Sequence, residues 1–74
     1  MAKNKLLVQI GSRIRAVREA QGLSQEETAM KASLDRAYYG RVERGEANVA
    51  ALNLLKIADT LGVDVGNFFP RHRG

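Results

Sequence analysis

The side chains best suited to chemistry in this sequence lie between residues 36 and 44. At 100° per residue, an α-helix over this segment turns Tyr39 and Val42 to one side. The opposite side carries only basic or small residues, namely Arg36, Ala37, Gly40, Arg41 and Arg44. Arginine can donate paired hydrogen bonds to O6 and N7 of guanine, and small neighbours let a helix approach a surface closely. The pattern predicts a helix that reads the major groove of DNA; a solvated arginine face is the alternative.

A second helix is predicted immediately before this one. Ser24 and Glu27 fit a capping box, in which each side chain accepts from the other residue's backbone N–H, so a helix should begin at residue 25. Asp35 can cap the next helix, which should begin at residue 36. Because only residues 33–35 separate the two helices, we expect them to cross steeply, as in a helix-turn-helix over about 25–44.

Apolar residues at helical spacing extend the pattern on both sides of this pair. Asn48 can cap a later helix, and Gly62 can end it. The sequence therefore predicts an all-α, single-domain protein over 1–74, with its core at about 9–69 and frayed ends. Five short helices are expected, at about 6–21, 25–32, 36–44, 49–61 and 65–69.

Composition limits the classes of function. The 74 residues include 12 Lys and Arg against 8 Asp and Glu, giving a formal net charge of +4, with one His and no Cys. A chain this short forms one core, which excludes a two-domain enzyme, and the lack of Cys excludes disulfides and thiolate metal sites. His72 has no accompanying ligand set, so we expect no metal. Because the sequence also lacks a glycine-rich phosphate loop and clustered carboxylates, we expect no cofactor and no catalysis. No apolar run is long enough for a membrane span, so we expect a cytoplasmic protein without membrane contact.

The segment Gln25–Gly45 resembles the helix-turn-helix of the Cro/CI-type (XRE) family of bacterial and phage regulators. The resemblance covers residues 9–69 and implies a five-helix, lambda-repressor-like DNA-binding domain. Glu43–Val49 followed by Leu52–Leu54 is most similar to the controller proteins of restriction–modification systems. Two further segments resemble the family's first helix with its junction and its fourth helix; these are Ile10–Gln25 and Leu54–Val63.

The resemblance implies roles for individual residues. Arg18 and Glu43 match a partly buried ion pair between the first and third helices. Base-reading positions are matched by Arg36, Ala37, Gly40 and Arg41. Contacts with the DNA backbone are implied for Ser24, Gln25, Tyr38 and Arg44. For Tyr38, packing against the turn is the alternative to this contact.

Three residues depart from the family pattern. Thr28 stands where Leu is usual, which trims the core. Ser33 replaces a turn glycine and costs roughly 1 kcal/mol if its backbone is left-handed. Gly40 lies inside the third helix, at a cost of up to about 1 kcal/mol relative to Ala. We expect Gly40 to be tolerated because it permits close approach to DNA.

Apolar residues near the C-terminus exceed what one small core requires, because Leu52 and Leu55 widen the stripe of the fourth helix. Both Phe rings could fold onto the domain's own core. We instead expect a homodimer that places two reading helices about 34 Å apart on a palindromic operator. Operator DNA, a second copy and RNA polymerase are the expected partners; an antitoxin-like protein-binding module is the alternative function. The expected dimer interface consists of Leu52, Val65, Phe68 and Phe69.

Overall fold

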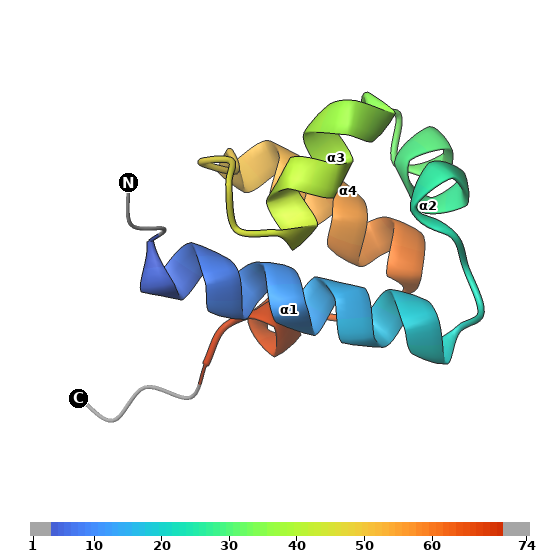
Figure 1. The fold of residues 1–74 in the computed structure, drawn as a ribbon. Helices are drawn as coiled ribbons and strands as arrows, with labels where there is room; N and C mark the ends of the chain where they lie inside the picture. Colours follow the sequence, from blue (N-terminus) through green and yellow to red (C-terminus); the bar gives the residue numbers. More distant parts are fainter. Residues whose placement is uncertain (1–3, 71–74) are drawn as a thin grey trace.

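The computed structural model describes residues 4–70 (Figure 1). Within this range the chain forms four α-helices and one short 3-10 helix, and it contains no strand. The all-α expectation is confirmed for these residues, whereas the expected number of five α-helices is corrected to four. His72 lies outside the described residues. The elements are α1 (Lys5–Ala20), α2 (Gln25–Lys31), α3 (Arg36–Glu43), α4 (Ala51–Leu61) and the 3-10 helix η1 (Val65–Phe68).

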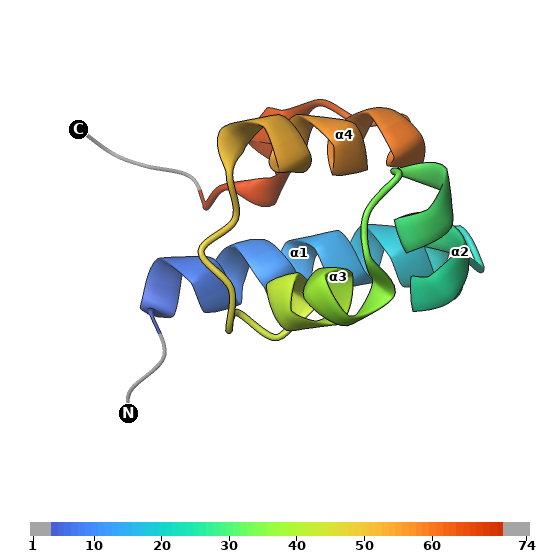
Figure 2. The same ribbon diagram turned by 90° about the horizontal axis from the view of Figure 1, so that it is seen from above.

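The helices enclose one core. α1 contacts α3, α4 and η1, while α2 contacts α3 and α4. Seen from above, α3 and α4 lie on opposite sides of the molecule, and α2 closes one end (Figure 2). The helical stripes of apolar residues face inward, as amphipathic helices require. The core consists of Ile10, Ile14, Ala29, Tyr39, Val42, Ala47, Leu54, Ile57, Ala58, Leu61 and Phe68.

Local hydrogen bonds set the ends of the helices where the sequence predicts them. The Ser24 hydroxyl accepts from the N–H of Glu27 at 3.0 Å, and the Glu27 carboxylate accepts from the N–H of Ser24 at 2.9 Å. The Asp35 carboxylate accepts from the N–H of Tyr38 at 3.0 Å and so begins α3. Gly62 ends α4 in the left-handed conformation, with φ of 70°. The predicted caps of α2 and α3 and the predicted stop of α4 are confirmed.

The turn between α2 and α3 has the geometry expected of a helix-turn-helix. Ser33 adopts a left-handed backbone with φ of 58°, the conformation that a glycine would adopt with less strain. The N–H of Leu34 donates to the carbonyl of Ala29 at 2.8 Å, which closes the end of α2. Thr28, expected to trim the core, is fully buried, and its hydroxyl donates to the carbonyl of Ser24 at 2.9 Å. The buried hydroxyl of Thr28 therefore has a hydrogen-bond partner at the N-cap of α2.

The start of α4 differs from the prediction. The helix begins at Ala51, two residues later than expected, and its N-cap Ala50 makes no side-chain hydrogen bond. Asn48 is exposed and does not cap α4. The segment after α3 stays non-helical, and it brings Ala47 into the core and Val49 against it. Burial of these two side chains therefore outweighs the local capping signal of Asn48.

The two adjacent phenylalanines have different environments. Phe68 is fully buried in the core of its own chain, so its expected role in a dimer interface is wrong. Phe69 remains exposed and has left the helix, with an extended backbone. The following Pro70 explains this ending, because proline disfavours helical conformation in the preceding residue. Val65 is partly buried and packs against the core.

At Gly11, the backbone of α1 lies very close to the end of α3. A Cβ atom added there would collide with the backbone carbonyl oxygens of Val42 and Glu43. Glycine is thus required at this position because the two helix backbones nearly touch. The separation between α1 and α3, and hence the position of α3, depends on it.

Replacing Gly11 with Ala should therefore lower the free energy of unfolding by about 1–3 kcal/mol, because backbone atoms cannot move aside as side chains can. Gly66→Ala is the matched control, since a Cβ at Gly66 would meet open space. Urea unfolding followed by circular dichroism measures both. Equal stability of the two variants would contradict the close contact.

Candidate nucleic-acid interface

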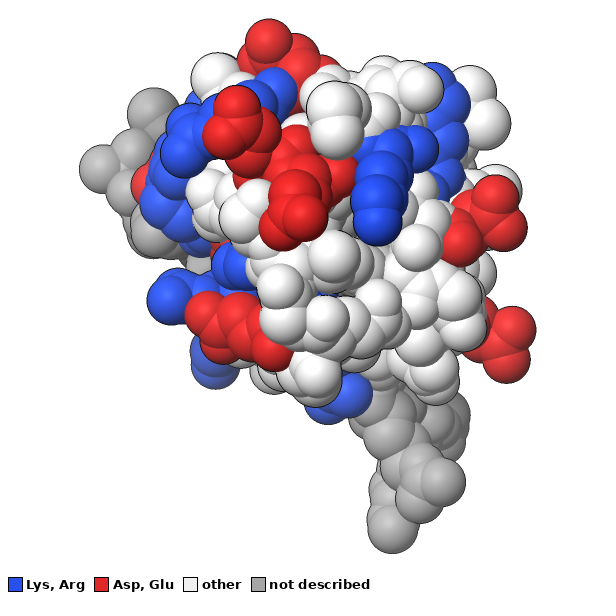
Figure 3. All heavy atoms as spheres, turned by 90° about the vertical axis from the view of Figure 1, so that its right-hand side faces the viewer, with Lys and Arg blue, Asp and Glu red and all other residues white. Residues whose placement is uncertain are grey.

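The exposed side of α3 carries the side chains that the sequence predicts for base reading. Arg36, Ala37 and Arg41 are exposed, whereas Tyr39, Val42 and Glu43 on the other side are buried. Neither the side chain of Arg36 nor that of Arg41 has a hydrogen-bond or ion-pair partner among residues 4–70. Figure 3, which faces the end of the molecule closed by α2, shows basic side chains gathered along one edge of this view, with acidic side chains among them. Two arginine side chains are therefore available to an external acceptor.

The position of α3 is held by a buried ion pair to α1. Arg18 donates to the two carboxylate oxygens of Glu43, from Nε at 2.6 Å and from Nη2 at 3.0 Å. Its Nη1 also donates to the carbonyl of Leu23 at 2.7 Å, in the junction before α2. The expected ion pair is present, and it is bidentate, which fixes orientation as well as distance. One guanidinium thus connects α1, the junction and α3.

Gln25, the first residue of α2, joins the same pair. Its Nε2 donates to Glu43 Oε1 at 2.9 Å, and its side chain is half-buried. Burial alone would raise the pKa of Glu43, but hydrogen bonds from Arg18 and Gln25 outweigh it and lower the pKa. The same carboxylate raises the pKa of Arg18. Both groups of the pair are therefore charged at neutral pH.

Tyr39 places a hydroxyl beside this pair. Burial, together with the neighbouring Glu43 carboxylate, raises the pKa of the Tyr39 hydroxyl. That hydroxyl oxygen is buried and has no hydrogen-bond partner among the described residues. The phenol therefore stays neutral, and α3 contributes a single buried charge to the interior.

Gly40 does not lie on the open side of α3 as its position on the helical wheel suggested. It is buried, and Gln25 and Arg44 cover it. A Cβ at this position would lie 3.2 Å from Nη1 of Arg44 and 3.6 Å from Oε1 of Gln25. Gly40 therefore provides room for two side chains in the free protein, and contact with a base would require both to move.

The residues expected to contact the DNA backbone all have internal partners. Ser24 caps α2, and Arg44 donates from Nε to Oε1 of Glu46 at 2.9 Å. The Tyr38 hydroxyl accepts from Nδ2 of Asn53 at 3.2 Å, and its ring packs against the core. Each hydroxyl keeps its own proton, so it can still donate to a phosphate oxygen. The partners Asn53 and Glu46 were not predicted, because nothing in their sequence spacing indicated these contacts.

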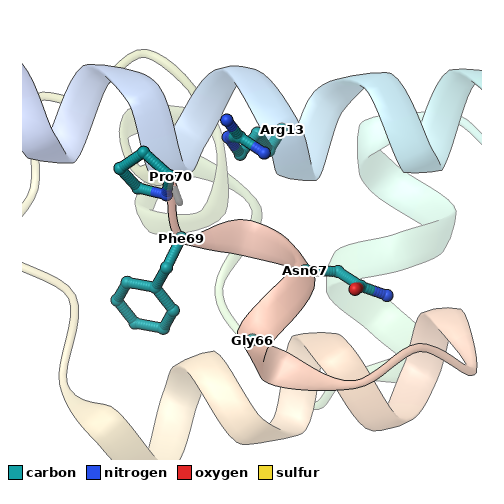
Figure 4. A pocket seen from close by; sticks show the side chains of 5 residues that line it. All are labelled: Arg13, Gly66, Asn67, Phe69 and Pro70. Atoms are coloured by element: carbon teal, nitrogen blue, oxygen red, sulfur yellow. The ribbon is translucent and has the colours of Figure 1, made fainter. Parts of the chain in front are cut away.

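A separate apolar surface lies on α4 and beside η1. Leu52, Leu55 and Phe69 are 64%, 52% and 40% exposed. Figure 4 shows the ring of Phe69 pointing away from Arg13 and α1, toward the side of α4. Leu55 was not among the interface residues predicted from sequence, although it belongs to the same stripe as Leu52. This surface differs from the predicted one by the loss of Phe68 and the gain of Leu55.

Residues 4–70 lack the features of a metal site and of a membrane span. No group of three or more His, Asp or Glu side chains in that range is placed to hold a metal ion. No helix of the described part of the chain has both the length and the hydropathy needed to cross a lipid bilayer. An open hollow between α1 and η1 is lined by Arg13, Gly66, Asn67, Phe69 and Pro70 (Figure 4).

The ion pair leads to a prediction about pH. Replacing Glu43 with Gln removes the buried bidentate partner of Arg18 and leaves only Glu19, whose exposed carboxylate lies 4.0 Å from Nη2 of Arg18. This should lower the free energy of unfolding by about 3 kcal/mol at pH 7. Because folding lowers the pKa of Glu43, its contribution is present above the ordinary glutamate value of about 4.3. That contribution disappears as the pH falls through the lower value of the folded state. Urea titrations between pH 7 and pH 3 should therefore show a smaller acid-dependent loss in the variant than in the wild type.

Two controls test the cause. Glu19→Gln breaks an exposed pair with Arg15, of Nε–Oε2 distance 3.1 Å, and a longer contact of 4.0 Å with Nη2 of Arg18. Because Glu19 is exposed, its loss should change the stability by less than about 1 kcal/mol, well below the effect of Glu43→Gln. The double change Arg18→Met with Glu43→Leu removes both buried charges and should recover much of the lost stability. A double variant as unstable as Glu43→Gln would rule out an unpaired charge as the cause.

The chain is similar to known proteins over most of its length. The helix-turn-helix family matches residues 14–68. Control protein C.MunI from a Mycoplasma species is 37% identical over 67 residues, covering 89% of this chain and 90% of that protein. Control protein C.BamHI from Bacillus amyloliquefaciens is 36% identical over 61 residues, covering 81% of this chain and 75% of that protein. The crystal structure of the restriction-modification controller protein C.AhdI from Aeromonas hydrophila matches at a TM-score of 0.83 and 48% identity, covering 85% of this chain and 96% of that one.

The match extends across the core, from the middle of α1 to the end of η1, and so includes both helices of the motif. Proteins of this family are regulators and not enzymes. With the short turn between α2 and α3 and the exposed arginines of α3, the similarity shows that this chain belongs to the helix-turn-helix family of DNA-binding transcription regulators.

Proposed function

We propose that the protein binds an operator by placing α3 in the major groove. The observation that carries this proposal is the exposed side of α3, where Arg36 and Arg41 have no internal partner and Ala37 adds little bulk. Arginine reads guanine through two hydrogen bonds, and the alanine methyl can contact a thymine methyl. Arg36, Ala37 and Arg41 supply the sequence preference. Gly40, which is covered, contributes space and no direct contact.

Contacts with the DNA backbone fix the position of α3 along the major groove. Gln25 lies at the N-terminus of α2, where backbone N–H groups and the helix dipole favour an anion. Its amide keeps a second N–H after donating to Glu43, and this N–H can donate to a phosphate. Ser24, Tyr38 and Arg44 add further donors along the same side. These contacts act on every sequence alike and make binding dependent on salt.

Dimerisation supplies the second half-site. The exposed side chains of Leu52, Leu55 and Phe69 form an apolar surface, with Val65 partly buried beside them. Removing that surface from water favours association with a second copy. A two-fold dimer would present two α3 helices to successive major grooves and would bind a palindromic operator. Binding would then depend steeply on protein concentration.

The similarity to C.MunI, C.BamHI and C.AhdI suggests the biological setting. Their names describe control proteins, and the last is described as the controller of a restriction-modification system. We infer the same role for this chain, namely control of a restriction–modification locus through operator binding. RNA polymerase is the proposed partner of an operator-bound dimer. An antitoxin-like role remains the competing function, and the next experiment separates the two.

Binding selection from randomised duplex DNA at near-physiological salt tests operator binding. We expect a two-fold symmetric consensus for the wild type. Arg41→Ala should weaken the free energy of operator binding by about 1–3 kcal/mol, because it removes a base contact. It should also relax the sequence preference at one guanine. Gln25→Ala should weaken all sequences alike. No enrichment over bulk DNA would favour the protein-partner alternative, and a uniform loss for both variants would contradict the division between base and phosphate contacts.

Sedimentation equilibrium tests the dimer. Leu52→Glu places a charge in the proposed interface, and it should shift the protein toward monomer at tens of micromolar. The substitution should not destabilise α4, because an acidic residue is favourable in the first turn of a helix. Met30→Glu is the control, since Met30 is the most exposed large apolar residue among residues 4–70 and lies on α2. A wild type that stays monomeric with and without DNA would refute the dimer.

A further inference from the structure

Two side chains on the proposed DNA-binding side lie above one glycine. Arg44, directly after α3, and Gln25, at the start of α2, both cover Gly40. The absence of a Cβ at Gly40 lets Nη1 of Arg44 lie where it would otherwise be crowded. Guanidinium and amide N–H groups are both donors to phosphate oxygens. The two residues therefore form a small donor surface, which we call the Gln25/Arg44 surface.

An acidic residue already occupies part of this surface. Oε1 of Glu46 accepts from Nε of Arg44 at 2.9 Å, and both side chains are exposed. The backbone holds Glu46 in place, because its N–H donates to the carbonyl of Arg41 at 2.8 Å. The N–H of Gly45 donates to the carbonyl of Val42 at 3.1 Å, which fixes the step between Arg44 and Glu46. The carboxylate thus stays within reach of the guanidinium.

We propose that Glu46 competes with DNA phosphate for Arg44 and thereby limits the sequence-independent affinity of the protein. This inference rests on the proposed function, because it requires Arg44 to contact the DNA backbone. A carboxylate and a phosphate both accept from the same guanidinium N–H groups. Phosphate must displace the carboxylate or share Arg44 with it, and the negative charge of Glu46 then lies near the DNA.

The ion pair between Arg44 and Glu46 contributes little to the stability of the free protein. An exposed ion pair over two residues contributes little to folding, because solvent screens it and both side chains lose freedom. On the DNA-binding side, however, its effect on binding is direct. The effect is also independent of sequence, since Glu46 acts through a phosphate contact and not through a base. Glu46 therefore lowers binding to operator and to bulk DNA by the same factor.

Fluorescence anisotropy with a random-sequence duplex measures this factor without knowledge of the operator. The full chain is titrated at several salt concentrations as wild type, Glu46→Gln, Arg44→Gln and the double variant. Asp59→Asn is the matched control, because it removes the same charge from an exposed position on α4. Circular dichroism confirms equal helix content in each variant.

We expect Glu46→Gln to bind about threefold to tenfold more tightly at low salt, with a salt slope steeper by up to about one per protomer. The gain should vanish in the Arg44→Gln background, and Asp59→Asn should change binding by less than about twofold. An equal gain in both backgrounds would show a general charge effect and overturn the competition. No gain, or weaker binding by Glu46→Gln, would overturn it as well. Failure of the wild type to bind any duplex would instead overturn the proposed function, and this inference with it.

Discussion

The bidentate pair between Arg18 and Glu43 is the interaction on which the arrangement of the motif depends. Its guanidinium also binds the carbonyl of Leu23, and its carboxylate also accepts from Gln25. Elements that are separate in sequence therefore meet at one buried pair of charges. The desolvation of such a pair cancels much of its attraction, so its main effect is on orientation and not on net stability. Gly11 complements it, because only a residue without a side chain lets α3 come close enough to α1.

Around this pair, the surface divides into side chains that are already bonded and side chains that are not. Gln25, Tyr38 and Arg44, which are proposed to contact phosphate, each have a partner inside the protein. Arg36 and Arg41, which are proposed to read bases, have none among residues 4–70. Ordered donors lose little freedom when they meet a regular backbone, whereas uncommitted arginines can adjust to base edges. The same scaffold can thus keep its docking geometry while the residues on α3 change the sequence that is read.

Features that depend on neighbouring residues could be predicted from the sequence. The capping box of Ser24 and the cap at Asp35 each involve atoms within about one helical turn. Features that depend on the assembled core could not. Which of Phe68 and Phe69 points inward is decided by the phase of a short 3-10 helix that Pro70 ends, and the cover over Gly40 is decided by residues from α2 and beyond α3. Asn48 failed as a cap for the same reason, since Val49 packs on the core.

These local contacts bear on how a small regulator discriminates between an operator and bulk DNA. Phosphate contacts raise the affinity for every sequence, so a protein with too many of them stays bound to non-specific sites. In the proposed competition, Glu46 weakens that general term for each protomer because it accepts from Arg44. In the proposed dimer two such protomers bind together, and the base contacts of both helices add while neither protomer alone binds strongly. Discrimination then arises from modest contacts on each half-site and from the apolar surface that joins them, and not from a single strong contact.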